Sequence, residues 1–146
     1  MIRKHKQYKR PRKLFDSARI SEENILIKKY GLKNKREIWK AAAIVEQIRK
    51  QAMALLRANK EIQEAFISRI RKKGLNVSSI ADVLALDKEM ILQRRLQTLV
   101  FKKGLASTPK GARQLITHRK IVIGDRIVNV PSYFVSADEE NKIRKK

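Results

Sequence analysis

The chain has 146 residues, enough for one domain or for two small domains that share a core. Its 36 Lys and Arg residues against 14 Asp and Glu residues give a formal net charge of +22, which predicts a polyanionic partner. The absence of cysteine excludes disulfides and thiolate metal sites, and the apolar content of 42% excludes a wholly disordered chain. No apolar run approaches the roughly 20 residues of a membrane span.

Residues 1–15 are predicted to form a basic N-terminal extension. Residues 1–13 hold seven cations and no acid, and such a segment cannot bury enough apolar surface to offset the entropy of ordering. We expect it to become ordered on nucleic acid, the alternative being a tail that only increases solubility. No apolar stretch follows it, so no secretory signal is expected. Its candidate RNA contacts are Arg3, Lys4, Lys6, Lys9, Arg10 and Arg12.

Residues 16–90 are predicted to form a helical domain. Ser21 is the expected N-cap of a first helix, with acidic residues in its first turn and Gly31 at its end. Asn34 and Glu37 resemble a capping box that opens a second helix. The buried stripe of that helix is predicted from helical spacing to be Ile38, Ala42, Val45, Ile48, Ala52 and Leu55.

Two further helices are expected before the pattern changes. Apolar residues between Ile62 and Ile70 predict a third helix, which the basic run before Gly74 closes. A short helix should begin near Ser79 and stop at Asp87. The first half of the chain is therefore predicted to be entirely helical.

Residues 91–136 are predicted to form a unit of two helices followed by a short antiparallel sheet. One continuous helix should run from Asp87 to Gly104, and a second should start at Thr108, since a hydroxyl N-cap is followed there by proline. Strand character appears at residues 121–123, 127–130 and 133–135, with a turn at residues 124–125. Residues 137–146 are expected to be a solvated tail, and the fold class is α+β.

Metal and catalytic chemistry find little support in the sequence. The two histidines, His5 and His118, lie far apart, whereas a zinc site needs about four N or S ligands, or three plus water. Ser107 and Thr108 precede a helix and suit capping better than nucleophilic attack. No phosphate-cradling glycine loop with an adjacent lysine is present. We expect no catalytic residue, no metal, no cofactor, no small-molecule substrate and no membrane association.

The stretch from residue 94 to residue 126 holds nine cations and one acid, and this predicts an RNA-binding surface. In a continuous helix Arg94, Arg95 and Lys102 can face one surface, and the next helix should offer a phosphate site at its N-terminus. The alternative is a solvated basic face. The candidate RNA-binding residues are Arg94, Arg95, Thr98, Lys102, Lys103, Ser107, Thr108, Lys110, Arg113, Gln114, His118, Arg119 and Lys120.

Aromatic residues are few, at 5% of the chain, so base stacking is not expected to be the main mode of binding. Tyr30 and Trp39 are predicted to be core residues, while Phe101, Tyr133 and Phe134 fit either a core or a stacking role. Phosphate and sugar contacts to a folded RNA shape fit this composition better.

Several motifs resemble a known family. The second unit is similar to the RNA-binding domain named after small-subunit ribosomal protein S-four. Residues 28–39 (KKYGLKNKREIW) and 92–100 (LQRRLQTLV) resemble the archaeal and eukaryotic form of that protein, and the likeness extends over about residues 8 to 140. The motif positions that carry the domain resemblance are Arg94, Leu96, Gly104, Ser107, residues 112–116 (ARQLI), Val122, Gly124 and residues 131–133 (PSY).

The resemblance implies a helical domain packed against the RNA-binding domain, with ribosomal RNA clamped by both. It implies a structural constituent of the small subunit that binds a helix junction in the 5′ domain, nucleates assembly, and contributes to translational accuracy near the messenger entry site. The resemblance also implies contact with neighbouring ribosomal proteins, including the S-five protein, and a cytoplasmic location. RNA contact is carried over onto Arg94, Arg95, Ser107, Thr108, Lys110, Arg113, Gln114 and His118.

This sequence departs from the family pattern at three points. It has no cysteine for the N-terminal zinc cluster of bacterial relatives, Gln97 stands where other members of the domain family carry Asp, and Thr108 replaces a frequent Arg or Lys.

Three other functions are compatible with a basic chain that carries this domain. A pre-ribosomal RNA processing factor, as a component of a small nucleolar ribonucleoprotein, would use the same domain. An RNA-modifying enzyme would need a further catalytic domain, and a helix-turn-helix protein would prefer duplex DNA.

Overall fold

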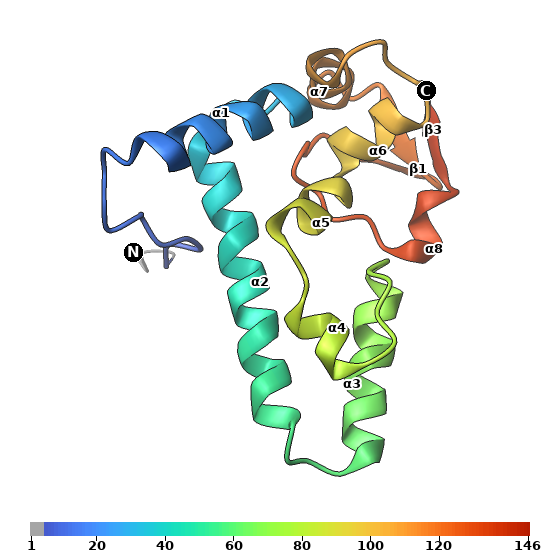
Figure 1. The fold of residues 1–146 in the computed structure, drawn as a ribbon. Coiled ribbons are helices and arrows are strands. Elements are labelled where there is room, and N and C mark those ends of the chain that lie inside the picture. The colour runs from blue at the N-terminus through green and yellow to red at the C-terminus, as the bar shows by residue number, and fades with distance from the viewer. Residues whose placement is uncertain (1–4) are drawn as a thin grey trace.

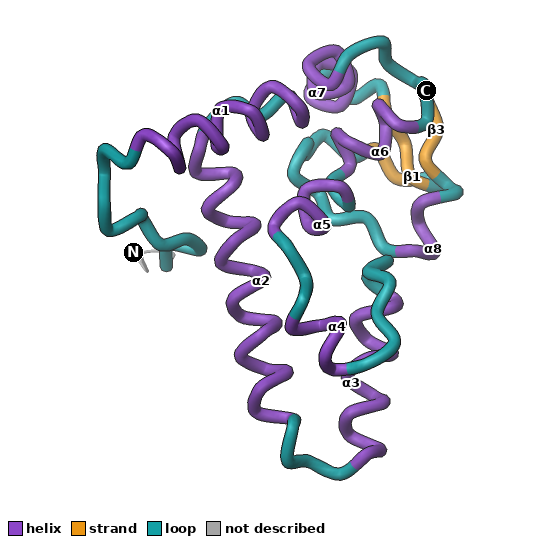
Figure 2. The backbone as a smooth tube through the Cα atoms, viewed as in Figure 1, coloured by secondary structure: helices purple, strands orange, loops and turns teal. Residues whose placement is uncertain are grey.

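The computed structural model of the chain describes residues 5–146, so the predicted RNA contacts Arg3 and Lys4 lie outside the described residues. Helices predominate, and a small sheet lies near the C-terminus (Figures 1 and 2). The helices are α1 (Ser17–Tyr30), α2 (Lys35–Leu55), α3 (Lys60–Lys72), α4 (Ile80–Leu84), α5 (Lys88–Gln93), α6 (Leu96–Lys102), α7 (Pro109–Thr117) and α8 (Ala137–Glu140). The strands are β1 (Ile121–Ile123), β2 (Arg126–Ile127) and β3 (Ile143–Lys145). The predicted α+β class is confirmed.

The long helix α2 forms one side of the molecule, with α3, α4 and α5 beside it (Figure 1). Of these, α4 and α5 pack directly against α2, while α6 packs against α7 in the second unit. Two hydrophobic clusters result. One is formed by α1 to α5, and the other by α6, α7 and the sheet with the segments around it.

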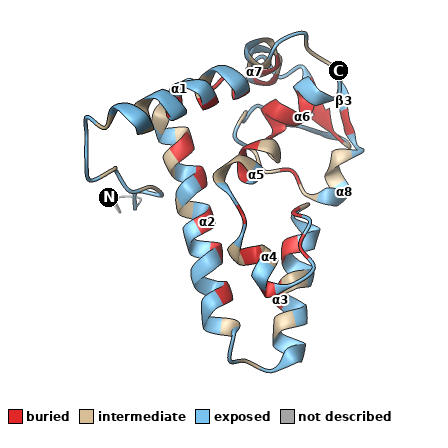
Figure 3. Cartoon of the chain, viewed as in Figure 1, coloured by how far each residue is buried: buried red, intermediate tan, exposed pale blue. Residues whose placement is uncertain are grey.

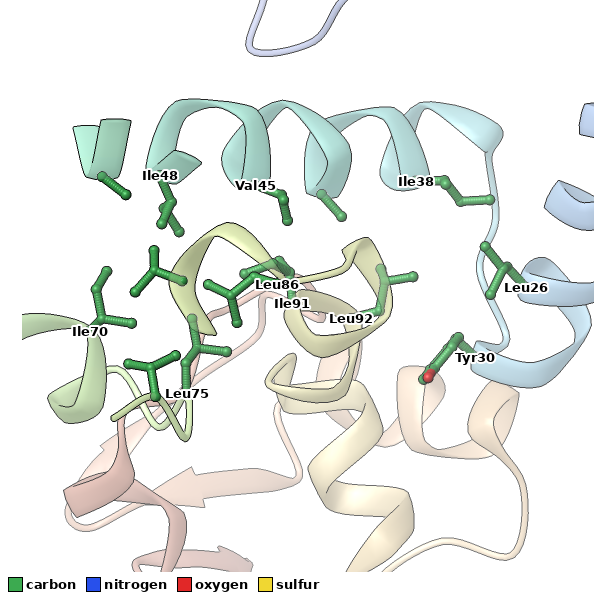
Figure 4. Packing of buried hydrophobic residues seen from close by; sticks show 14 of the residues in the cluster. Leu26, Tyr30, Ile38, Val45, Ile48, Ile70, Leu75, Leu86, Ile91 and Leu92 are labelled. Carbon is green, nitrogen blue, oxygen red and sulfur yellow. The ribbon is translucent and has the colours of Figure 1, made fainter. Parts of the chain in front are cut away.

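Buried side chains along α2 form one wall of the first cluster, and Figure 4 shows them pointing toward Ile70, Leu86 and Leu92. Each fully buried leucine or isoleucine stabilises the fold by about 1.5–3 kcal/mol. The predicted stripe differs from the structure at two positions: Ala41, 3% exposed, is buried instead of the exposed Ala42, and Leu55 is only partly buried. The buried residues of α2 are Ile38, Ala41, Val45, Ile48 and Ala52.

The first helix begins earlier than the sequence predicts. Asp16 and not Ser21 is its N-cap, and the Asp16 side chain accepts the backbone N–H of Arg19 at 3.4 Å. Ser21 lies inside the helix, where its hydroxyl donates to the Ser17 carbonyl at 2.9 Å. Aspartate and serine are equally good caps, so local chemistry did not separate the two starts. The earlier start places Glu23 beyond the first turn, in a buried position.

The helix predicted to be continuous in the second unit is two helices, α5 and α6, separated at Arg94 and Arg95. Arg95 is extended, with φ −72° and ψ 142°. Residues 131–135 run beside the break, and the Leu96 N–H donates to the Tyr133 carbonyl at 2.8 Å. The neighbouring segment thus pairs backbone groups that a helix terminus leaves unsatisfied. The break therefore depends on residues far along the chain.

The sheet is built around β1, in the order β2-β1-β3, with both pairs antiparallel. The predicted turn at Gly124 and Asp125 is confirmed, because these two residues join β1 to β2, with Val122 opposite Ile127. The predicted strand at residues 133–135 is wrong, since that segment pairs with the α5–α6 break through an isolated bridge.

The last ten residues do not form the predicted solvated tail. They contain α8 and the edge strand β3, in which Ile143 lies opposite Ile123 of β1. Ile143 is 6% exposed and belongs to the second hydrophobic cluster. One isolated apolar residue among charged neighbours gives no alternation from which a strand can be predicted.

Candidate RNA interface

A basic groove of about 990 Å³ lies between the N-terminal extension, which we call the arm, α2 and the loop that holds residues 131–134. Seven cationic side chains and two acidic ones line it. The cations are Lys6, Lys9, Arg36, Lys40, Lys50, Arg95 and Arg113, and the acids are Glu37 and Glu46. Cations gathered on a concave surface focus positive potential there, and this favours a polyanion such as an RNA backbone.

The outer face of α2 supplies groove cations that the sequence reasoning did not assign to the site. Arg36, Lys40 and Lys50 are exposed, and their helical spacing places them on one side of α2. Figure 3 shows α2 with exposed and buried positions alternating along its length, as expected for a helix with one buried face. Lys50 also forms a surface ion pair with Glu46 at 3.2 Å. The available signal was a basic face opposite an apolar stripe, which alone does not distinguish a binding face from a solvated one.

Glu37, near the start of α2, holds two arginines of the second unit. Arg95 Nη2 donates to Glu37 Oε2 at 2.5 Å, and Arg113 Nη2 donates to Glu37 Oε1 at 3.2 Å. The side chains of Glu37 and Arg95 are only 15% and 8% exposed. Burial alone would raise the pKa of Glu37, but the two arginines outweigh it and lower that pKa below its ordinary value. Glu37 therefore links the two halves of the chain and does not complete the predicted capping box with Asn34.

Gln97, 1% exposed, joins the end of α1 to the start of α7. Its amide nitrogen lies within hydrogen-bond distance of three backbone carbonyls, those of Tyr30 at 3.1 Å, Gly31 at 3.0 Å and Pro109 at 3.0 Å. Its amide oxygen accepts Arg113 Nη1 at 3.3 Å. Gly31 ends α1 as predicted, with φ +61°, and a Cβ there would lie 2.8 Å from Pro109 Cβ. The two helix ends can approach this closely because the residue is glycine.

Helix α7 carries a second basic surface, which we call the α7 surface. Thr108 is the N-cap as predicted, and its hydroxyl accepts the Gly111 N–H at 3.0 Å, so this donor is not free for a phosphate. Arg113 lies between the α7 surface and the groove that it also lines. The exposed residues of the α7 surface are Ser107, Thr108, Lys110, Gln114, His118, Arg119 and Lys120.

Three residues predicted to contact RNA are held by partners within the fold, because the break after α5 changes the direction of their side chains, although Arg95 still borders the groove. Arg95 pairs with Glu37 as described above. Arg94 Nη1 donates to Glu140 Oε2 at 2.5 Å, and Thr98, 7% exposed, donates its hydroxyl to the Leu92 carbonyl at 2.8 Å. These side chains hold the fold together and do not share one exposed surface, contrary to the expectation from helical spacing.

The remaining predicted cations lie at the end of α6 and along the arm. Lys102 and Lys103 are exposed, and Lys103 donates to the backbone carbonyl of Glu140. In the arm, Lys6 and Lys9 line the groove, and Lys9 pairs with Glu46 at 3.1 Å. Arg10 and Arg12 are exposed. The described part of the arm has no regular secondary structure, and Lys9 contacts α2 through its exposed ion pair with Glu46.

Glu23 is a second buried carboxylate, and it connects α1 to α2. Trp39 Nε1 donates to it at 2.9 Å, Arg19 Nη1 at 2.8 Å, and Lys35 Nζ lies 3.3 Å away. Burial alone would raise the pKa of Glu23, but these three donors outweigh it and lower that pKa. Tyr30, 6% exposed, and Trp39 both pack in or against the first cluster, which confirms their prediction as core residues.

Within residues 5–146, no three histidine, aspartate or glutamate side chains are grouped so that they could hold a metal ion. No helix in the described part of the chain combines the length and the apolar character needed to cross a membrane.

Comparison with known proteins decides the family. The S4 domain family model matches residues 94–141. The chain is 46% identical to small ribosomal subunit protein uS4 of Methanoregula boonei, over 95% of this chain and 81% of that relative. The uS4 protein of Thermoplasma volcanium is 47% identical, over 95% and 74%, and that of Methanothermobacter thermautotrophicus is 43% identical, over 94% and 84%. The chain belongs to the uS4 family.

In this uS4 family member, the S4 domain match begins at Arg94, where α5 ends, and reaches Asn141 just after α8. Strand β3 lies beyond the match but completes the sheet. The cations of α2 lie outside the matched domain. The groove is therefore a joint feature of the helical half of the uS4 chain and its S4 domain, which meet at Glu37.

Proposed function

We propose that this chain is a structural constituent of the small ribosomal subunit that binds small-subunit ribosomal RNA. The observation that carries the proposal is the identity of 41–47% to uS4 proteins over nearly the whole chain. The excess of positive charge in the groove supports it independently, because ribosomal RNA is a polyanion. The relatives are named as ribosomal proteins, so the alternative of a pre-ribosomal RNA processing factor is not favoured.

The proposed mechanism is charge neutralisation by two surfaces held at a fixed distance. The groove receives one stretch of RNA backbone on Lys6, Lys40 and Arg36, and the α7 surface contacts another through Lys110 and Lys120. Arg113 lies where the two surfaces meet. Glu37 and Gln97 fix the position of Arg113, so the two surfaces are preorganised and less ordering entropy is lost on binding.

We propose a helix junction in the 5′ domain as the RNA site, nucleation of subunit assembly as the consequence, and a non-catalytic role. We also propose a contribution to translational accuracy near the messenger entry site, contact with the S-five protein and a cytoplasmic location. Co-sedimentation with mature small subunits supports this proposal, whereas co-sedimentation with precursor particles alone contradicts it.

Removing two groove cations tests the assignment of the surface. The double variant Arg36→Ala, Lys40→Ala is expected to bind a 5′-domain RNA fragment more weakly, by roughly tenfold for each charge-assisted hydrogen bond that is removed. The slope of log affinity against log salt should fall by about one for each phosphate that is no longer neutralised. Filter binding over a range of salt concentrations measures both quantities.

A charge-matched control separates a local effect from that of net charge. Arg57→Ala, Lys60→Ala also removes two exposed cations, but from the loop that follows α2 and from the start of α3. We expect this control to bind nearly as the unmodified chain does. Equal reductions of affinity in the two double variants would contradict the groove as the RNA site and leave only a general effect of charge.

A further inference from the structure

Phe15 is the most exposed large hydrophobic side chain in the part of the chain that the structure describes, at 94%. It lies in a turn at the end of the arm, directly before the N-cap of α1. A phenylalanine ring buries a large apolar area when it packs against the fold. The ring of Phe15 does not pack against the described residues 5–146, which give no reason for an aromatic residue at this position.

The turn that carries Phe15 is held by hydrogen bonds. Arg19 Nη2 donates to the carbonyl of Lys13 at 3.0 Å and to that of Leu14 at 2.9 Å. Arg19 Nη1 in turn donates to the buried Glu23 at 2.8 Å. The backbone beside the ring is thus tied through one arginine to the core of the helical half. A ligand that packs on this ring meets a preorganised support and orders little additional chain.

The segment that leads to the ring is strongly basic, although Asp16, the N-cap of α1, directly follows Phe15. Between residue 5 and residue 15 there is no acid. The same segment contains the cations Lys6, Lys9, Arg10, Arg12 and Lys13. A partner for this surface must therefore offer negative charge and a flat apolar face close together. An unpaired RNA base offers its π face next to its own phosphate, so it meets both requirements.

We infer that Phe15 is a stacking site for an unpaired base of the RNA bound by this chain, an inference that rests on the proposed function. The neighbouring Arg12 and Lys13 neutralise the phosphates on either side of that base. The arm then contributes a base contact in addition to charge, and it does so outside the matched S4 domain. Because every base has a π face, the contact requires an unpaired nucleotide but no particular sequence.

Four variants at two positions test this inference on the full chain and the 5′-domain RNA fragment. Phe15→Ala and Phe15→Leu should weaken binding by roughly 5–150-fold, because both remove the aromatic face. Phe15→Trp should bind as the unmodified chain or more tightly. Leu14→Ala, which removes the adjacent side chain that is 62% exposed, should leave the affinity unchanged.

Two further readouts distinguish stacking from its alternatives. None of the four variants removes a charge, so the slope of log affinity against log salt should stay constant. The unfolding temperature of Phe15→Ala should match that of the unmodified chain, because the ring is exposed. Full affinity in Phe15→Ala overturns the stacking site while the proposed function stands. Full affinity in Phe15→Leu overturns it as well and indicates apolar docking. Failure of the unmodified chain to bind this RNA overturns both proposals.

Discussion

Replacing Glu37 by alanine is expected to lower the free energy of unfolding by about 3–5 kcal/mol, the range for removing one partner of a buried ion pair. The Arg95 side chain is only 8% exposed, and Glu37 is its carboxylate partner among residues 5–146. Removal of this carboxylate leaves a buried guanidinium without compensating charge and also releases Arg113. Chemical denaturation of the RNA-free chain measures the change. Glu37→Gln, which keeps hydrogen-bonding atoms but no charge, should lie between the unmodified chain and the alanine variant.

The matched control for this experiment is Glu46→Ala on the same helix. Glu46 also pairs with two cations, Lys9 at 3.1 Å and Lys50 at 3.2 Å, but it does so on the exposed surface. Exposed ion pairs are screened by water and salt and add little to stability. We therefore expect a much smaller change than at Glu37. Equal changes at the two positions would show that burial of the Glu37 pair is unimportant and that the two halves are not joined there.

Replacing Gly31 by alanine is expected to lower the free energy of unfolding by about 2–5 kcal/mol. Part of this decrease comes from the left-handed conformation at φ +61°, which costs about 1–2 kcal/mol for a residue with a Cβ. The rest comes from overpacking, typically about 1–3 kcal/mol, because the new methyl group would lie 2.8 Å from Pro109 Cβ. Thermal or chemical unfolding reports the sum.

Gly104→Ala isolates the conformational part of that decrease. Gly104 also follows a helix with φ +72°, but a Cβ there meets no atom of residues 5–146 within 4 Å. Only the conformational cost of about 1–2 kcal/mol is expected at this position. The difference between the two variants therefore measures the close approach of α1 and α7. If the two alanine variants are destabilised equally, the contact between Gly31 and Pro109 does not hold the two helices together.

Features decided by local chemistry could be predicted from the sequence. Gly31 ends α1 because a helix C-terminus favours a residue that tolerates positive φ, and Thr108 with Pro109 starts α7 because cap and first turn are specified by adjacent residues. Most of the apolar stripe of α2 follows from the helical period. Each of these signals lies within a few residues of the feature that it specifies.

Features decided by distant partners could not be predicted. The break at Arg94 and Arg95 depends on backbone bonds from residues 131–135, and β3 depends on the pairing of Ile143 with β1. The same limit applies to the interface. Sequence identifies the basic residues, but which of them face RNA depends on where the few acids lie. Glu37 holds two arginines and Glu140 holds one, all far away in the chain.

In the mechanism proposed above, this chain binds ribosomal RNA because the groove and the α7 surface neutralise RNA phosphates. The most direct test of this mechanism is the affinity of the unmodified chain for the 5′-domain RNA fragment as a function of salt. If six to ten phosphates are contacted, the affinity should fall by roughly 10³–10⁵-fold between about 50 and 200 mM salt. An affinity that does not change with salt would contradict the account.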